Sequence, residues 1–154
     1  MSDAAVALVL VAVAVCGLVT GSLVNVAAYR VPTGIPLRRA SHCPQCTAPV
    51  RGWRNLPIAS WIALRGRCQH CRARIPVRLP LVEAGTAVAF VVVAAWMLRV
   101  AEPLGPAAGW SATLLMTAAY LYFTAVSILL ALIDIDVRRL PDAIVLPSLS
   151  LIHI

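Results

Sequence analysis

Charged side chains are scarce in this sequence: they make up 12% of its 154 residues, about half of the share found in soluble globular proteins. Lysine is absent altogether, and aromatic residues contribute only 6%. The apolar content of 61% is therefore mainly Ala, Val, Leu and Ile. Such a composition excludes a disordered chain, which needs abundant polar residues, and argues against a conventional soluble enzyme. It is typical of helices that face lipid.

Long uncharged runs take the place of the missing charges. Residues 4–29 and 110–133 each exceed the roughly 20 residues that a helix needs to cross a bilayer. A shorter run reaches that length if residues 79–83 are included, with Glu83 at the water boundary. A cleaved signal peptide is the alternative for the first run, but its apolar core is normally about 7–15 residues and follows basic residues. We predict an all-α integral membrane protein with three transmembrane helices, at residues 1–29, 81–99 and 110–134.

The segment 30–80, between the first two predicted spans, has a different composition. It carries ten of the thirteen arginines, seven of the eleven prolines and neither Asp nor Glu. Because proline interrupts helices, we expect turns, short strands and one helical turn near residues 58–64. No internal repeat is evident in the sequence.

Arginine placement predicts the orientation in the membrane. Short arginine-rich loops stay in the cytoplasm, so segment 30–80 is expected there, with Arg138 and Arg139 on the same side after the third span. A basic loop could instead bind nucleic acid, but no recognition helix or aromatic platform accompanies these arginines. We therefore expect the lipid bilayer as a partner and no nucleic acid.

Four of the five cysteines form two C-x2-C pairs, Cys43 with Cys46 and Cys68 with Cys71. A two-residue gap lets both thiolates of a pair reach one ion, and two pairs complete a tetrahedral zinc shell. In a reducing cytoplasm structural disulfides are disfavoured, although redox-active thiols remain an alternative. Four thiolates close the shell and leave no position for a catalytic water. We predict a structural zinc ion that stabilises the irregular segment 30–80.

Three carboxylates gather where the third predicted span ends: Asp134, Asp136 and Asp142. Asp134 directly follows the apolar run, and an ionisable group at that depth is a functional candidate. The alternative is a solvated helix end, with Asp136 paired to Arg139. Aspartic peptidase chemistry needs two carboxylates that share a proton. Asp134 and Asp136 are two residues apart, so they diverge on a helix, and the partner of Asp134 must come from elsewhere.

Several short segments between about residues 17 and 147 occur in an order found in a known family. They are GSLVNV at 21–26, RVP at 30–32, SHCPQC at 41–46, NLP at 55–57, SW at 60–61, GRCQHC at 66–71, RLPLVE at 78–83, ID at 133–134 and LPD at 140–142. This series resembles the type IV prepilin peptidases, the membrane aspartic proteases that process the leaders of type IV prepilins and pseudopilins.

The resemblance implies roles for particular residues. Asp134 matches the first catalytic aspartate, and the four paired cysteines match the metal-binding cysteines of the N-terminal cytoplasmic domain. Many members cleave the leader and then N-methylate the new amino terminus with S-adenosylmethionine, an activity associated with the basic loop. This chain has no glycine-rich cofactor loop, so methyl transfer follows from the resemblance alone. The implied location is the bacterial inner membrane, and the implied substrates are prepilin or pseudopilin leader peptides.

One departure from the family pattern concerns the second catalytic aspartate, which members carry in a G-x-G-D motif. The sequence contains no such motif. We therefore expect residues 135–154 to be the truncated start of a peptidase domain, with a missing C-terminal half or a second chain needed to complete the dyad. Two alternatives remain: a non-catalytic membrane zinc module that binds a secretion or pilus assembly partner, and a membrane thiol-redox protein.

Overall fold

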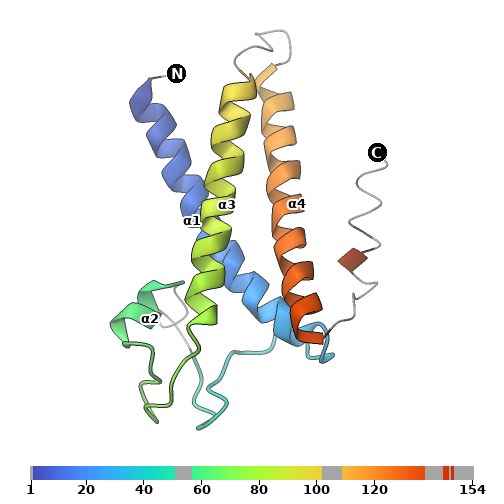
Figure 1. Cartoon of the computed structure of the whole chain (residues 1–154). Helices are drawn as coiled ribbons and strands as arrows, with labels where there is room; N and C mark the ends of the chain where they lie inside the picture. The colour runs from blue at the N-terminus through green and yellow to red at the C-terminus, as the bar shows by residue number, and fades with distance from the viewer. Residues whose placement is uncertain (1, 51–56, 102–108, 138–143, 146, 148–154) are drawn as a thin grey trace.

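The computed structural model describes residues 2–50, 57–101, 109–137, 144, 145 and 147. Three long helices dominate this part of the chain (Figure 1). They are α1 (Asp3–Arg30), α3 (Arg78–Ala101) and α4 (Gly109–Val137), and the short α2 (Ala59–Ala63) lies between α1 and α3. Each long helix is long and apolar enough to cross a membrane, which confirms the predicted fold class. The helical turn expected near residues 58–64 corresponds to α2.

Helix α1 has local signals at both ends. The Ser2 side chain caps it by accepting a hydrogen bond from the Ala5 N–H at 3.4 Å, and Asp3 in the first turn faces the positive end of the helix dipole. Arg30 lies in the last turn, where a positive charge is favourable. Val31 caps the helix with φ and ψ still in the helical region, −61° and −49°, and its N–H donates to the Ala27 carbonyl. The next residue, Pro32, has no N–H to continue the pattern.

Two glycines bring α1 unusually close to α3. A β-carbon added at Gly17 would lie 2.6 Å from the Ala87 Cα, and one added at Gly21 would lie 2.7 Å from the Glu83 Cα. The helix backbones therefore touch, as in the small-residue contacts common between membrane helices. The face that α3 buries follows a helical repeat: Glu83, Thr86, Ala87, Phe90, Ala94 and Met97.

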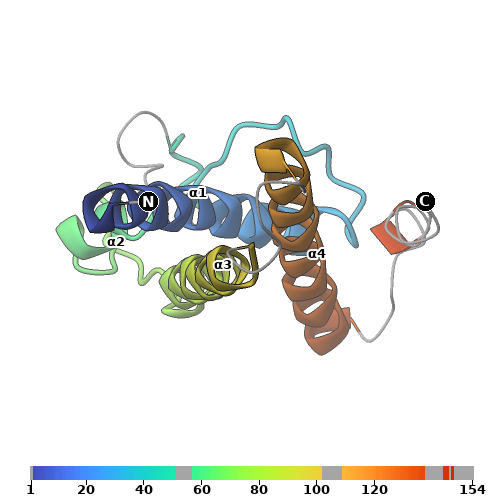
Figure 2. The ribbon, with the colours of Figure 1, turned by 90° about the horizontal axis from the view of Figure 1, so that it is seen from above.

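Helix α4 lies beside α3 and runs antiparallel to it, whereas α1 crosses α3 at a marked tilt (Figures 1 and 2). Near one end the rings of Trp96 and Tyr120 meet edge to face, with centroids 5.6 Å apart. At the other end Arg78 donates two hydrogen bonds of 2.7 Å to the Asp136 carboxylate. These contacts fix the register of α3 against α4 at both ends.

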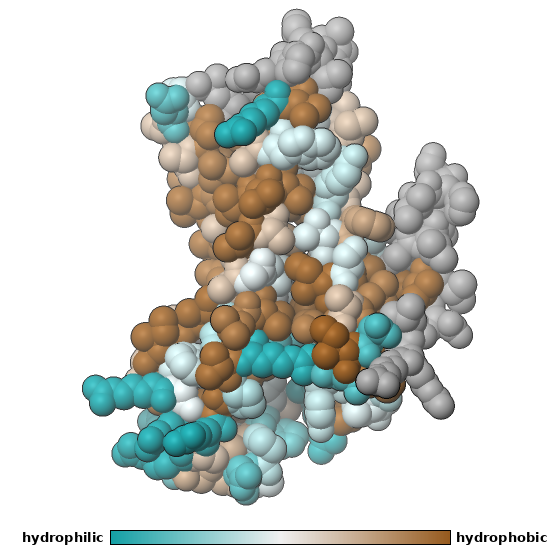
Figure 3. All heavy atoms as spheres, viewed as in Figure 1, coloured by the Kyte–Doolittle hydropathy of each residue, from teal (hydrophilic) through white to brown (hydrophobic). Residues whose placement is uncertain are grey.

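Polar and apolar side chains separate along the helix axes. The end of α1, the start of α3 and the end of α4 lie at the same end of the molecule, together with residues 31–50 and 57–77 (Figure 1). Hydrophilic side chains gather at this end, while the helices above it expose mainly hydrophobic ones (Figure 3). The exposed large apolar residues on the helices include Leu8, Val11, Val88, Val92, Leu114 and Leu115. A lipid-facing surface of this kind suits a membrane protein.

Candidate metal centre and adjoining cavity

The four paired cysteines converge on one point. Their sulfur atoms all lie within 4.8 Å of one another. The Sγ atoms of Cys43 and Cys71 are 3.8 Å apart, and those of Cys46 and Cys68 are 3.9 Å apart. A tetrahedral ion with metal–sulfur bonds of about 2.3 Å would place its sulfurs roughly 3.8 Å apart. The donor set and its spacing therefore fit a metal ion of the zinc type.

Each cysteine pair lies in a turn of the same construction, which we term knuckle 1 (residues 41–50) and knuckle 2 (residues 66–75). In knuckle 1 the Cys43 N–H donates to the Ala48 carbonyl at 2.9 Å, and in knuckle 2 the Cys68 N–H donates to the Ala73 carbonyl at 2.8 Å. An isolated antiparallel bridge closes each knuckle, His42 with Pro49 and Arg67 with Arg74. The two knuckles thus repeat one backbone design.

The repeat extends to an unusual backbone conformation. The residue after the second cysteine has a positive φ in both knuckles, 55° at Thr47 and 60° at Arg72, a region that residues other than glycine seldom occupy. The shared pattern is x-C-x-x-C-x-A-x-V/I, found at 42–50 and 67–75. Although no repeat was evident when the sequence was considered alone, this short pattern is the signal that could have predicted it.

Backbone N–H groups surround the first sulfur of each knuckle. The N–H groups of Cys46 and Gln45 lower the pKa of the Cys43 thiol. Those of Cys71 and His70 lower the pKa of the Cys68 thiol to about 6. Such donors stabilise a thiolate, which is the form that binds metal. Each knuckle therefore presents at least one sulfur that is prepared for coordination.

The fourth sulfur behaves in the opposite way. The Ala73 N–H lowers the pKa of Cys71, but burial and the hydrogen bonds of the other three thiols outweigh it and raise the pKa to about 11. Four sulfurs this close cannot all ionise without a compensating positive charge. A divalent cation would supply that charge and hold all four as thiolates.

Arg30 joins the first knuckle to the membrane helix. Its side chain is only 8% exposed, and its Nη1 donates to the carbonyl oxygens of Leu37 and Arg39 at 2.7 and 2.6 Å. Its Nη2 donates to the Ser41 hydroxyl at 3.4 Å. The guanidinium at the end of α1 therefore orders the chain that leads into knuckle 1. From the sequence, Arg30 was identified as one charge of a basic segment and as part of the RVP segment at 30–32, without this ordering role.

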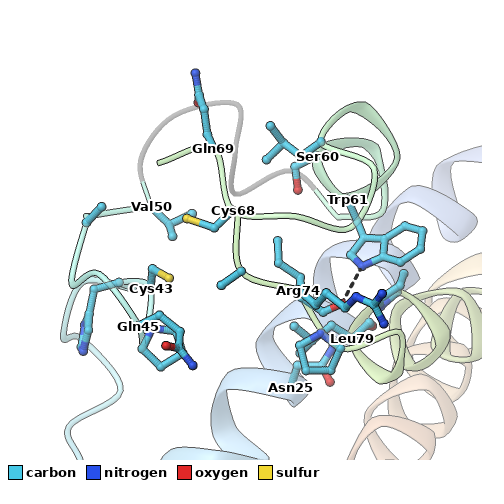
Figure 4. Close-up of a pocket in the computed structure, with 18 of the residues that line it drawn as sticks. Asn25, Cys43, Gln45, Val50, Ser60, Trp61, Cys68, Gln69, Arg74 and Leu79 are labelled. Carbon is cyan, nitrogen blue, oxygen red and sulfur yellow. Dashed lines mark hydrogen bonds between the residues drawn. The ribbon is translucent and has the colours of Figure 1, made fainter. Parts of the chain in front are cut away.

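A cavity of about 460 Å³ separates the knuckles from the helices. Its walls come from α1, both knuckles, α2 and the start of α3, and Figure 4 shows Asn25, Cys43, Cys68 and Trp61 around it. The Trp61 Nε1 donates to the Ile75 carbonyl at 3.4 Å, which links α2 to knuckle 2. The Asn25 amide of α1 donates to the Leu79 carbonyl of α3 at 3.0 Å.

Glu83 is the acidic residue in the wall of this cavity. It lies near the start of α3, where the structure buries it to 8% exposure. Its Oε2 accepts a hydrogen bond of 2.7 Å from the Ile58 N–H, and Ile58 has a positive φ of 52°. Sequence reasoning missed this role because it depends on where the segment before α2 returns to α3.

Asp134 and Asp136 project from α4 in different directions. Asp136 turns toward α3 and pairs with Arg78. Arg139, the partner considered from the sequence, lies outside the described residues, as does Asp142. Asp134 is exposed, while its neighbour Ile133 is fully buried. The structure therefore brings the four cysteines together but leaves Asp134 on an open surface of α4.

Comparison with known proteins places these features in a family. Residues 15–97 match the family model described as the Bacterial Peptidase A24 N-terminal domain. The chain belongs to this family. The match covers the second half of α1, both knuckles, α2 and most of α3, so it includes the cysteine cluster and the cavity. It confirms the family resemblance inferred from the sequence.

Several curated relatives of this A24 N-terminal domain share a name. Proteins named "Prepilin leader peptidase/N-methyltransferase" are 36% identical in Neisseria gonorrhoeae, 40% in Pseudomonas putida and 41% in Aeromonas hydrophila. The alignments cover 90%, 89% and 71% of this chain, and 52%, 51% and 33% of the relatives. The chain therefore spans about half the length of the first two relatives. No solved structure matches it.

Proposed function

We propose that this chain is the N-terminal portion of a membrane aspartic endopeptidase that cleaves the leader peptides of type IV prepilins or pseudopilins. We further propose that the complete enzyme N-methylates the new amino terminus with S-adenosylmethionine. The observation that carries both proposals is the alignment of nine-tenths of the chain with relatives named for leader peptidase and N-methyltransferase activity.

Asp134 is the proposed catalytic aspartate of this portion. An alignment over 90% of 154 residues leaves about 15 residues unaligned, fewer than the 20 that follow Asp134, so the aligned region reaches past it. Its exposure on α4 supports the assignment, because a carboxylate from another segment could approach it there. Asp136 fits the role less well, since Arg78 already binds both of its oxygens.

An aspartic dyad divides the work between two carboxyl groups. The ionised one takes a proton from the attacking water, and the protonated one donates to the oxygen of the scissile carbonyl. Asp134 can fill one of these positions only. The second carboxyl group, by resemblance the aspartate of a G-x-G-D motif, would come from the part of the relatives that this chain does not span or from a second chain.

The proposed metal is a structural zinc ion held by Cys43, Cys46, Cys68 and Cys71. The tetrahedral sulfur spacing and the paired knuckles support this assignment. When bound, the ion would supply the charge that keeps four thiolates together, and would stabilise a segment with few apolar anchors. We place the knuckles in the cytoplasm, at the inner membrane of a bacterium, because of their arginine content.

The proposed function is tested by joining this chain to the C-terminal half of the Pseudomonas putida relative and assaying leader cleavage in membranes. We expect the joined protein to cleave a prepilin leader and the 154-residue chain alone not to do so, because one carboxylate cannot act as both acid and base. Asp134→Asn should reduce cleavage by at least about a hundredfold, in line with general acid–base contributions.

Asp136→Asn is the matched control, because it makes the same chemical change two residues away. It removes an ion pair whose partners are 46% and 35% exposed, so a mild effect is expected. Full cleavage by the Asp134→Asn protein would contradict the assignment. Absence of cleavage from a well-folded joined protein would favour the alternative of a non-catalytic zinc module that binds an assembly partner.

A further inference from the structure

The cavity beside the knuckles has an apolar lining with one carboxylate in its wall. The apolar contributors come from every element around it: Val26, Val50, Ile58, Trp61, Leu64, Ile75, Pro76, Leu79 and Pro80. Glu83 reaches the wall from α3, and its Oε2 is held by the Ile58 N–H. A volume of about 460 Å³ is typical of a pocket for a small ligand or for one or two side chains of a peptide.

The other polar groups in the wall limit what the cavity can accept. Asn25 already uses its amide N–H on the Leu79 carbonyl. Arg74 is the one arginine among the described lining residues, and it is exposed. His42 and His70 lie at the exposed rim formed by the knuckles. An anion that entered deeply would meet the Glu83 carboxylate, whereas a cation would gain from it.

We propose that this cavity binds the free amino terminus of a peptide, with its α-ammonium group on the Glu83 carboxylate and its first apolar side chain against Trp61. The inference rests on the proposed function, because leader cleavage produces such an amino terminus and N-methylation acts on it. An ammonium group gains from a mostly desolvated carboxylate and from an aromatic face. The apolar walls favour a hydrophobic first residue.

Glu83 is therefore a binding residue for the amine and has no assigned part in peptide-bond cleavage. Glu83 and Asp134 have different proposed roles because they lie in different places: Asp134 is exposed on α4 and does not line the cavity. The hydrogen bond to Ile58 fixes the carboxylate in place before any ligand arrives. Such preorganisation reduces the cost of ordering the site on binding.

The proposal is tested by direct binding to the purified 154-residue chain in detergent. The probes are a short synthetic peptide with a free amino terminus and two apolar first residues, and the same peptide N-acetylated. We expect the free peptide to bind at least about tenfold more tightly, because acetylation removes the charge that Glu83 recognises. Glu83→Gln should abolish this difference while keeping an acceptor for the Ile58 N–H.

Thr86→Val is the matched control, since Thr86 is buried one turn further along the same face of α3 and does not line the cavity. Its hydroxyl donates to the Val82 carbonyl of its own helix. It should keep the tenfold preference. Helical content and bound zinc are measured in both variants, and if Glu83→Gln alters them, Glu83→Asp is tested for partial retention of the preference.

Equal binding of the two peptides, or an unchanged preference in a folded Glu83→Gln protein, would overturn the proposal. Binding of S-adenosylmethionine that depends on Glu83, without any peptide preference, would also overturn it and assign the cavity to the methyl donor. These measurements use no cleavage reaction. A failure of the amine site is therefore distinguishable from a failure of the proposed peptidase function, which the joined protein tests separately.

Discussion

The cysteine side chains are the residues whose individual chemistry can be tested most directly. Cys43→Ser or Cys68→Ser removes one sulfur from a four-sulfur cluster and leaves an incomplete shell. We expect bound zinc to fall from about one ion per chain to much less, with loss of order in the knuckles, because metal binding and folding are coupled in such sites. Elemental analysis and thiol counting on purified protein measure both effects.

Cys16→Ser is the matched control for these substitutions. Cys16 is exposed on α1 and lies outside the cluster, so its replacement should leave the zinc content unchanged.

Acidification should release zinc from the unmodified protein, because protons compete with the metal for thiolates. Purified protein that contains no zinc and has four freely reactive thiols would contradict a structural metal. It would instead favour the alternative of a membrane thiol-redox protein.

Residue-level prediction from the sequence succeeded where spacing alone defines the chemistry. The two C-x2-C pairs predicted that four sulfurs would meet, and the structure brings them together. Glu83 and Arg30 could not be assigned in this way. The Glu83 carboxylate accepts from a backbone N–H 25 residues away, and Arg30 donates mainly to backbone carbonyls 6 to 9 residues away. Only the path of the irregular segment places those groups beside them.

At the scale of the elements, the packing of α1 on α3 depends on the absence of side chains at two positions. Gly17→Val would place a β-carbon 2.6 Å from the Ala87 Cα, so the helices would have to separate. Overpacking of this kind costs about 1–3 kcal/mol. We expect a lower free energy of unfolding in mixed micelles.

Gly85→Ala is the control for the glycine substitution. A β-carbon at Gly85 meets nothing within 4 Å, and alanine is the better helix former by about 1 kcal/mol. This variant should be as stable as the unmodified protein or slightly more stable. If Gly17→Val and Gly85→Ala were equally stable, the close contact between α1 and α3 would not be a determinant of the fold.

The elements differ in how far the sequence predicted them. Long apolar runs predicted the three membrane helices, because lipid requires every backbone group to bond within its own segment. Segment 30–80 contains no long apolar run that would predict its structure in the same way. Its short antiparallel bridges and the positive φ values at Thr47 and Arg72 follow from closing a turn around two sulfurs, a constraint that hydropathy and helix propensity do not register.

For the whole molecule, the charge distribution predicts the direction in which the helices cross the bilayer. Ten of the thirteen arginines fall in segment 30–80, and Arg138 and Arg139 follow the third helix. The structure places the end of α1, the start of α3 and the end of α4 at one end of the molecule (Figure 1). One side of the membrane would therefore hold nearly all of the positive charge, as the positive-inside rule requires for the cytoplasm.

Reporter fusions test this orientation. Fusions after Gly52 and after Asp142 should both report the cytoplasm, and a fusion after Gly105 should report the opposite side. One candidate span lies between Gly52 and Gly105, and one lies between Gly105 and Asp142. Replacing several arginines of segment 30–80 with glutamine should weaken the preference, whereas Arg99→Gln, which removes a single charge at the other end of α3, should leave it unchanged. A cytoplasmic signal from the Gly105 fusion alone would contradict the three-span arrangement. Inverted signals from all three fusions would instead place the cysteine knuckles in an oxidising compartment, where a four-thiolate zinc site would not be expected to persist.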